Sequence, residues 1–326
     1  MSPGKRQRLA KLCGSDGIIA ALAVDQRGTL RRALAEAKGV SEEAVAADMA
    51  VFKTAVTRIL GPQATAVLLD VDYGMPAIAV HDRRVGLLLA YEKWGYDRSR
   101  PGRMQETLDG WTVARLVEAG ADSIKILLFY TPFEQEEINT CKRRWVKRIG
   151  DECRTNDVPF CLEPLVYDPT GAGEASAAFA AVKPRAVAGC IEVFSRPEFG
   201  VDLLKVEVPV NISYVEGTRA HRGGRVVCTR SEALDAYRRA AEAARVPFVY
   251  LSAGVDHDVF LESLELAAEA GVAFNGVLCG RATWKDAIPA YAQHGLPALE
   301  AWLHDQGTRN IQALNALLAQ TASPCA

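Results

Sequence analysis

The strongest constraint on the fold is an alternation of short apolar runs with longer amphipathic segments along most of the chain. Short apolar runs bounded by turn residues are typical of buried strands, and segments with apolar residues three or four positions apart are typical of helices. The regular succession of the two predicts strand–helix units, whose strands form a parallel sheet covered by helices. The sequence is therefore expected to fold as an α/β protein.

Eight runs qualify as strands, and this number decides the architecture. They are Gly17–Val24, Ala64–Asp70, Gly86–Tyr91, Ser123–Phe129, Val158–Val166, Val201–Val208, Pro247–Ser252 and Ala273–Leu278. Helical patterns between them include Ser41–Ile59, Thr112–Ala119, Glu134–Asn156, Arg230–Arg245 and Asp256–Ala270, with Ser41 as an expected helix cap. Eight strand–helix units in about 260 residues favour a closed (β/α)8 barrel, the TIM barrel, over an open doubly wound sheet.

The last part of the chain continues in helices. Patterns at Ala287–His294, Leu299–Asp305 and Ile311–Thr321 follow the eighth strand, and no low-complexity linker separates them from it. We therefore expect a single domain over residues 1–326, in which residues 285–326 form a helical extension packed on the barrel.

Charge and composition favour a small-molecule partner and a cytoplasmic location. The 326 residues carry 38 basic and 40 acidic side chains spread along the chain, so neither nucleic acid nor an anionic membrane is an expected partner. No apolar stretch reaches the roughly 18 residues of a membrane span, and the first residues lack the apolar block of a signal peptide. We expect a homo-oligomer formed through the outer helices.

Charged residues within strands are the main functional signal. A barrel strand is buried on both faces, so a charge there is costly unless it is paired or functional. Five predicted strands carry such residues in their interior or at their end: Asp25, Asp70 and Asp72, Lys125, Glu163, and Lys205 with Glu207. Alternate residues of a strand share a face, so Lys205 lies on the face of Leu203, and Glu163 on the face of Cys161. If these faces line the barrel interior, the charges converge near the carboxyl ends of the strands, where barrel enzymes hold their active sites.

Lys205 is the predicted nucleophile of that site. A lysine in a tight, partly dry pocket beside another cation is destabilised as an ammonium, and its amine becomes reactive. Lys205, with Lys125 as a neighbour, fits this description, and Glu163 would move protons during imine formation and carbon–carbon cleavage. The alternative is a set of buried ion pairs that only hold the barrel interior together, and the presence of charges in five strands counts against it.

The ends of the last two strands predict a phosphate site. The segments Leu251–Val255 and Leu278–Ala282 place Ser252, Gly254 and Gly280 where backbone N–H groups can approach an anion, and Arg281 adds a cation. Arg27, just beyond the first strand, either holds a second phosphate or pairs with an acidic neighbour. A phosphorylated substrate is therefore expected.

The sequence lacks the motifs of a metal or nucleotide cofactor. Its histidines are scattered, and none pairs with another at ligand spacing: His81, His221, His257, His294 and His304. Asp70 and Asp72 are acceptable magnesium ligands, but two aspartates at a strand end more often cap a loop or bind sugar hydroxyls. No GxGxxG motif follows the first strand and no GxxxxGK(S/T) motif occurs, so we expect neither a metal nor a cofactor.

Seven segments of the chain carry a resemblance to a known family: Ala21–Gly28, Leu68–Gly74, Gly86–Lys93, Gly120–Lys125, Leu204–Asn211, Tyr250–Val255 and Phe274–Trp284. They resemble the class I tagatose 1,6-bisphosphate aldolases of the tagatose 6-phosphate pathway of lactose and galactose metabolism. The resemblance runs nearly end to end. It implies a metal-independent lyase that forms a Schiff base with a phosphorylated ketose.

The resemblance also implies roles for individual residues. Lys205 would be the Schiff-base lysine and Glu163 the proton shuttle. The residues implied to position the amine and the intermediate are Asp25 and Lys125. Those implied to contact the substrate phosphates are Ser252, Gly254, Gly280 and Arg281 at one end of the substrate, and Gln26 and Arg27 near the other.

Two departures from the family leave the substrate open. Val71–Asp72 stands where relatives often have a Pro–Glu pair, and the Arg219–Arg225 loop is richer in arginine and glycine. One alternative is therefore a lysine aldolase that acts on a sulfosugar phosphate of the 6-deoxy-6-sulfofructose 1-phosphate type, since an arginine-rich pocket also accepts a sulfonate. A second is a barrel kept as a non-catalytic sugar-phosphate sensor, against which Lys205 and Glu163 argue.

Overall fold

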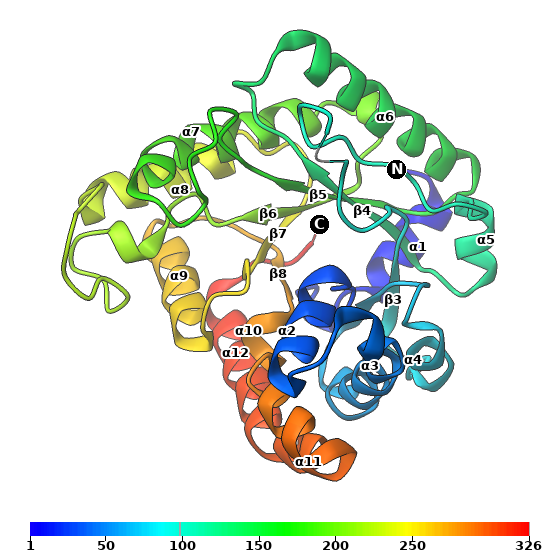
Figure 1. The fold of residues 1–326 in the computed structure, drawn as a ribbon. Coiled ribbons are helices and arrows are strands. Elements are labelled where there is room, and N and C mark those ends of the chain that lie inside the picture. The colour runs from blue at the N-terminus through cyan, green and yellow to red at the C-terminus, as the bar shows by residue number, and fades with distance from the viewer. Residues whose placement is uncertain (98, 326) are drawn as a thin grey trace.

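The computed structural model describes residues 1–97 and 99–325, which form a closed barrel of eight parallel strands (Figure 1). The strands are β1 (Ile19–Ala23), β2 (Ala66–Leu69), β3 (Gly86–Ala90), β4 (Ser123–Phe129), β5 (Phe160–Leu165), β6 (Leu203–Glu207), β7 (Phe248–Leu251) and β8 (Gly276–Cys279). Each strand pairs with its neighbours in chain order, and β8 closes the barrel against β1 with Ala21 opposite Leu278. The eight predicted strands and the closed (β/α)8 barrel are confirmed.

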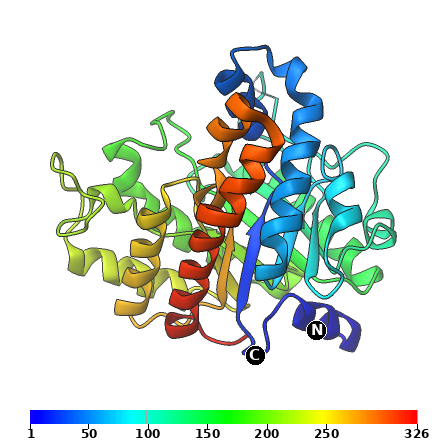
Figure 2. The ribbon, with the colours of Figure 1, turned by 90° about the horizontal axis from the view of Figure 1, so that it is seen from below.

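Helices cover the outside of the barrel (Figures 1 and 2). Those that connect the strands are α2 (Gly28–Lys38), α3 (Ala46–Leu60), α4 (Met75–Val80), α5 (Val113–Glu118), α6 (Glu136–Thr155), α7 (Ala177–Phe194), α8 (Arg230–Glu242) and α9 (His257–Glu269). Helix α1 (Pro3–Lys11) precedes β1, and α10 (Arg281–Trp284) follows β8. Short 3-10 helices are η1 (Glu42–Val45), η2 (Gly61–Gln63), η3 (Pro197–Phe199) and η4 (Ile212–Tyr214). Among the helices of the described ranges, none combines the length and the apolar character needed to cross a membrane.

Local sequence explains where several helices begin. Thr229 and Glu232 form a reciprocal capping box at the start of α8, and Thr112 caps α5. The predicted cap Ser41 heads the 3-10 helix η1 without a side-chain hydrogen bond, so that α3 begins only at Ala46. No predicted helix covers α7, because Pro184 and a largely apolar sequence hide its helical period.

The chain after α10 forms three further helical pieces. The predicted helices Ala287–His294 and Leu299–Asp305 overlap α11 (Ala287–Trp302), which is kinked at Gly295, where φ is 73° and ψ is −163°. The π-helical turn η5 (Leu303–Gly307) then leads into α12 (Thr308–Thr321). Helix α11 contacts α2 and α3, and α12 contacts α9. This extension therefore covers the barrel where the first and last strands meet (Figure 2).

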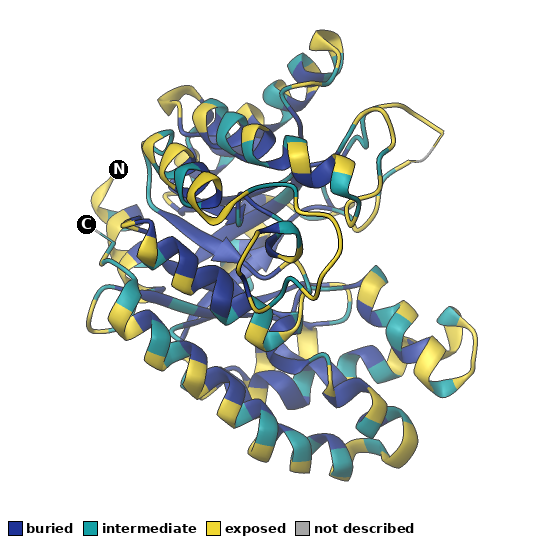
Figure 3. Ribbon diagram, turned by 90° about the vertical axis from the view of Figure 1, so that its left-hand side faces the viewer, coloured by how far each residue is buried: buried dark blue, intermediate teal, exposed yellow. Residues whose placement is uncertain are grey.

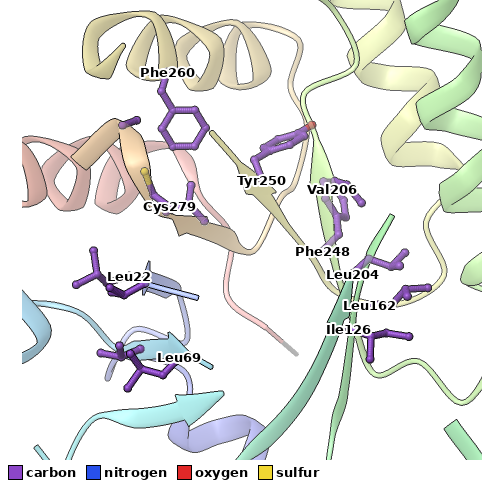
Figure 4. Close-up of a cluster of buried hydrophobic side chains, with 14 of the residues drawn as sticks. Leu22, Leu69, Ile126, Leu162, Leu204, Val206, Phe248, Tyr250, Phe260 and Cys279 are labelled. Atoms are coloured by element: carbon purple, nitrogen blue, oxygen red, sulfur yellow. The ribbon is translucent and has the colours of Figure 1, made fainter. Parts of the chain in front are cut away.

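The apolar interior has two layers. Side chains on the outer face of the strands, such as Leu22, Ile126 and Leu204, pack between the barrel and its helices (Figure 4). The lumen holds a smaller apolar cluster that includes Leu203 of β6 and Leu9 of α1. Figure 3 shows the strands as the most deeply buried part and the outer helix faces as the exposed part. Helix α1 and the residue that follows it, Leu12, pack against this cluster, and the charged residues of the lumen line the pocket at the carboxyl end of the barrel.

Gly276, the first residue of β8, lies where β8 packs closely against β1. Its φ is +121°, and a Cβ at this position would lie 1.9 Å from the carbonyl oxygen of Ile19 on β1. We predict that Gly276→Ala lowers the free energy of unfolding by about 3 kcal/mol or more, because both the backbone conformation and the new contact are strained. Urea unfolding monitored by circular dichroism measures this loss.

Gly271→Ala is the matched control. Gly271 follows α9 with a φ of +72°, but in the described chain nothing lies within 4 Å of a Cβ placed there. Its replacement should cost only the conformational penalty of about 1–2 kcal/mol. Equal losses in the two variants would contradict the steric account of barrel closure.

Candidate active site

A pocket opens at the carboxyl ends of the strands, the usual position for this fold. All of the predicted site residues line it: Asp25, Gln26, Arg27, Lys125, Glu163, Lys205, Ser252, Gly254, Gly280 and Arg281. They come from β4, β5 and β6 and from the segments that follow β1, β7 and β8. The structure thus brings together residues that lie far apart in the sequence, and their individual roles stay predictions.

The centre of the pocket is a buried chain of charges. Glu163 Oε1 lies 2.9 Å from Lys205 Nζ, and Glu163 Oε2 lies 2.8 Å from Lys125 Nζ. Both contacts are ion pairs, and Glu163 Oε2 has no hydrogen-bond partner among the described residues. Lys125 Nζ also contacts Asp25 Oδ2 at 2.8 Å and Glu92 Oε1 at 3.0 Å. The two lysines are therefore joined through Glu163, and each of these side chains is at most 8% exposed.

The two lysines differ in how many carboxylates surround them. Burial by itself would lower the pKa of Lys125, but attraction by Asp25, Glu163 and Glu92 outweighs it and raises this pKa well above 10.5. Burial would raise the pKa of Asp25, but the charges of Lys125 and Lys205 hold it far below its usual value of 3.8. Lys125 is therefore expected to stay protonated and Asp25 to stay ionised. Within the described residues, Glu163 is the carboxylate that forms an ion pair with Lys205.

Asp25 offers an acceptor to a ligand. Its Oδ2 receives a hydrogen bond from Lys125, whereas its Oδ1 is buried and has no hydrogen-bond partner among the described residues. A buried, unpaired carboxylate oxygen is costly, and a hydroxyl group of a bound sugar would supply the missing donor. This geometry suits the predicted role of Asp25 in positioning the amine and the intermediate, which stays a prediction.

The loops after β7 and β8 form the cationic end of the pocket. A Cβ at Gly254 would approach Arg281 Cζ to 2.7 Å, so that a side chain there would displace the guanidinium group from its present position. Ala253 has a φ of +50°, a strained conformation for a residue with a side chain, and such strain is frequent at ligand sites. No acidic side chain of the described chain forms an ion pair with Arg281, which leaves its charge available to an anion. Ser252 is buried and lines the same pocket.

Arg27 is engaged by acidic neighbours. Its Nη1 lies 3.0 Å from Asp72 Oδ2 and its Nη2 lies 2.9 Å from Glu92 Oε1. Nη1 also donates to the backbone carbonyl of Glu92 at 2.8 Å. Of the two alternatives for this arginine, pairing with an acidic residue is the one present in the structure, and a contact with the second phosphate stays a prediction.

The aspartates at the end of β2 have structural partners. Asp70 forms a fully buried ion pair with Lys53 of α3, and its Oδ1 accepts a hydrogen bond from the backbone of Tyr73, which caps the loop. Asp72 pairs with Arg27. Across residues 1–97 and 99–325, no group of three or more histidine, cysteine, aspartate or glutamate residues has the arrangement of a metal site.

Two members of the charge network were not predicted. Glu92, two residues after the end of β3, contacts both Arg27 and Lys125. Lys183 of α7 pairs with Glu207 of β6 at 3.2 Å. The signal for Glu92 was a charged residue that directly follows the predicted strand Gly86–Tyr91, the same signal that identified Asp25. The partner of Glu207 lies in α7, for which no helix was predicted.

Comparison with known proteins agrees with the fold and with the resemblance of the sequence. The chain is 46% identical over 319 residues to the tagatose 1,6-diphosphate aldolase of Streptococcus pneumoniae, with 98% of this chain and 96% of that protein covered. It is 45% identical over 324 residues to tagatose 1,6-diphosphate aldolase 2 of Streptococcus mutans, with coverages of 99% and 97%.

A solved structure of fructose-bisphosphate aldolase from Plasmodium falciparum has the same fold. It superimposes with a TM-score of 0.69 at 16% identity, over 98% of this chain and 95% of that one. The family described as DeoC/LacD family aldolase matches residues 19–286, from the start of β1 to just before α11. On the family match and the two close relatives, this chain belongs to the DeoC/LacD family of aldolases.

Proposed function

We propose that this protein is a metal-independent class I aldolase that cleaves D-tagatose 1,6-bisphosphate into dihydroxyacetone phosphate and glyceraldehyde 3-phosphate. The relatives named above are tagatose 1,6-diphosphate aldolases, and their similarity covers nearly the whole chain. The observation that carries the chemistry is the contact of 2.9 Å between Lys205 Nζ and Glu163 Oε1 at the bottom of the pocket. It places a nucleophile within reach of a group that can take its proton.

Substrate binding begins at the cationic end. One phosphate would lie against Arg281 and the backbone of Gly254 and Gly280, with Ser252 as a further hydrogen-bond donor. Arg27 lines the same pocket and would face the other phosphate of a bisphosphate, whereas Gln26 lies next to Gly280, where its Nε2 would be 2.7 Å from an added Cβ. Fixing the substrate at a phosphate orients its C2 carbonyl toward the amine of Lys205, and such orientation contributes a large part of catalysis.

Imine formation uses Lys205 and Glu163. Lys205 gives a proton to Glu163, and its neutral amine then adds to C2 of the ketose. A proton moves from nitrogen to the former carbonyl oxygen, which yields a carbinolamine. The carbinolamine hydroxyl leaves as water with the proton held by Glu163, and a protonated imine remains.

Cleavage and release follow from the positive charge on that imine. A carboxylate, which we assign to Glu163, removes the proton of the C4 hydroxyl. The electrons of the C3–C4 bond move to the iminium nitrogen, and glyceraldehyde 3-phosphate leaves as the aldehyde. The remaining enamine takes a proton at C3, and water then hydrolyses the imine to free Lys205 and dihydroxyacetone phosphate.

Replacement of the nucleophile gives the first test of this function. We predict that Lys205→Met lowers kcat by at least about a thousandfold, because the covalent route is lost while the binding groups stay. Borohydride reduction of the wild-type enzyme with substrate, followed by peptide mass mapping, should place a triose phosphate on Lys205. Lys147→Met, a change at a surface lysine of α6, should leave both the rate and the label unchanged. Undiminished turnover by Lys205→Met would reject the assignment.

A chelator separates this chemistry from metal-assisted cleavage. We predict that tagatose 1,6-bisphosphate is cleaved at the same rate before and after incubation with EDTA, because the iminium and not a metal ion accepts the electrons. Product analysis with coupled triose phosphate assays measures the rate. Assays with a sulfosugar phosphate under the same conditions test the alternative substrate. Loss of activity in EDTA that returns with a divalent metal would contradict the proposal.

Arg281 tests the phosphate end of the pocket. We predict that Arg281→Ala lowers kcat/KM by about 10- to 150-fold, which corresponds to the loss of a charged hydrogen bond of roughly 1.5–3 kcal/mol. Arg281→Lys keeps the charge without the forked geometry and should recover part of the loss. Steady-state kinetics measures both, and an unchanged kcat/KM in Arg281→Ala would show that the phosphate binds elsewhere.

A further inference from the structure

The carboxylate of Glu92, at the carboxyl end of the barrel, accepts three hydrogen bonds from protein donors. Its Oε1 accepts hydrogen bonds from Arg27 Nη2 at 2.9 Å and from Lys125 Nζ at 3.0 Å. Its Oε2 accepts one from the backbone N–H of Leu127 on β4 at 3.1 Å, and its backbone carbonyl accepts one from Arg27. Glu92 is 3% exposed. It therefore joins the ends of β1, β3 and β4 and has no oxygen left for a ligand.

The lumen contains two amines, Lys125 and Lys205, either of which could react with a substrate. Lys125 and Lys205 both contact Glu163, at 2.8 Å and 2.9 Å, and both line the same pocket. Either amine would condense with a ketone if it lost its proton beside the bound substrate. A productive enzyme needs one of them neutral and the other permanently charged.

The three carboxylates around Lys125 are not equivalent. Glu163 is shared with Lys205, and in the proposed reaction it takes up and releases protons, so it is not a constant counter-ion. One buried oxygen of Asp25 has no hydrogen-bond partner among the described residues, so a substrate hydroxyl can donate a hydrogen bond to it. Glu92 alone of the three has both carboxylate oxygens occupied by protein donors and has no ion pair with Lys205 among the described residues.

From this geometry we infer that Glu92 is a positioning residue that fixes Lys125 as the permanent cation of the site and thereby leaves Lys205 as the amine that reacts. The inference rests on the proposed Schiff-base function and adds the residue that decides which lysine carries it. The raised pKa of Lys125, to which Asp25, Glu163 and Glu92 contribute against the effect of burial, agrees with it.

The charged groups around Lys125 determine the pH at which it loses its proton, and therefore how activity depends on pH. Asp25 reaches it from the end of β1, Glu92 from the segment after β3 and Glu163 from β5. Arg27 lies beyond Glu92 and Lys205 beyond Glu163. The thiol of Cys161, opposite Lys125 in the register with β5, has its pKa raised to about 12 by burial. Loss of activity at alkaline pH is then expected to follow the deprotonation of Lys125.

Glu92→Gln removes the charge and keeps the shape. The amide has one acceptor oxygen for the three donors, which are Arg27, Lys125 and the backbone N–H of Leu127, and its NH2 group must face one of them. Lys125 is therefore held less firmly in its charged form. We expect kcat to fall by about tenfold or more while KM changes by less than about threefold. Since removal of a negative charge makes the ammonium easier to deprotonate, the alkaline decline of kcat should move to lower pH by about one unit or more. Borohydride reduction at pH 9 should label Lys125 in addition to Lys205.

Two further variants separate charge from structure. Glu92→Asp keeps the charge on a shorter side chain, and its alkaline decline should stay closer to that of the wild type. Glu106→Gln makes the same chemical change at an exposed residue of the same segment and should alter neither the rate nor the label. An alkaline decline in Glu92→Gln that superimposes on the wild type, with label on Lys205 alone, would overturn the inference even if kcat is lower.

The wild-type enzyme keeps the inference testable if Glu92→Gln does not fold. Reduction of the wild type with substrate at pH 7.5 and at pH 10 should label Lys205 alone at both values, and label on Lys125 at pH 10 would overturn the role of Glu92. Absence of label on Lys205 at pH 7.5 would instead refute the proposed function itself. The two failures are therefore distinguishable.

Discussion

One carboxylate shared by two lysine side chains organises this site. Glu163 of β5 lies between Lys125 of β4 and Lys205 of β6, and all three side chains are buried in the lumen of the barrel. Charges in such a place are tolerated only when they are paired, because their loss of hydration is large. The alternation of side chains along three adjacent parallel strands turns these groups to the same side, where the carboxylate of Glu163 reaches both amines although Lys125 lies opposite Cys161 in the register. The reactive centre follows from the geometry of the sheet.

The rest of the barrel supports this charged layer. Below it, Leu203, Cys161 and their neighbours fill the lumen, and Leu9 and Leu12 of the N-terminal segment close the amino end. Burial of these apolar groups, and of the larger layer between strands and helices, stabilises the fold and offsets the cost of the buried charges. Above the charged layer, the segments after β7 and β8 line the pocket, and Arg281 there has no acidic partner in the described chain. A small anionic ketone thus meets a fixed cation first and a nucleophile deeper in the pocket.

Much of the fold was predictable because strand periodicity and burial are local properties of the sequence. Eight apolar runs gave the barrel, and a charge within such a run identified Lys125, Glu163 and Lys205. Partners that are distant in the sequence were not predictable. Glu92 and Arg27 are 65 positions apart, and no pattern along the chain states that they meet.

Local exceptions account for the other differences. Ser41 has the residue type of a helix cap, yet a 3-10 turn intervenes before α3, since several turn geometries satisfy the same short sequence. Helix α7 contains Pro184 and few polar residues, so that its period is weak although its length is 18 residues. For Arg27 the sequence left open a phosphate or an acidic partner, and the choice depended on Asp72 and Glu92 reaching it from β2 and β3.

The central claim is that the ketone carbon becomes an imine of the protein. Imine formation expels the carbonyl oxygen as water, and hydrolysis returns an oxygen from the solvent. The most direct measurement is therefore the incorporation of ¹⁸O into C2 of dihydroxyacetone phosphate incubated with the enzyme in H₂¹⁸O, followed by mass spectrometry. The account predicts incorporation well above the uncatalysed rate. Sugar cleavage at full speed with no enzyme-dependent incorporation would contradict it.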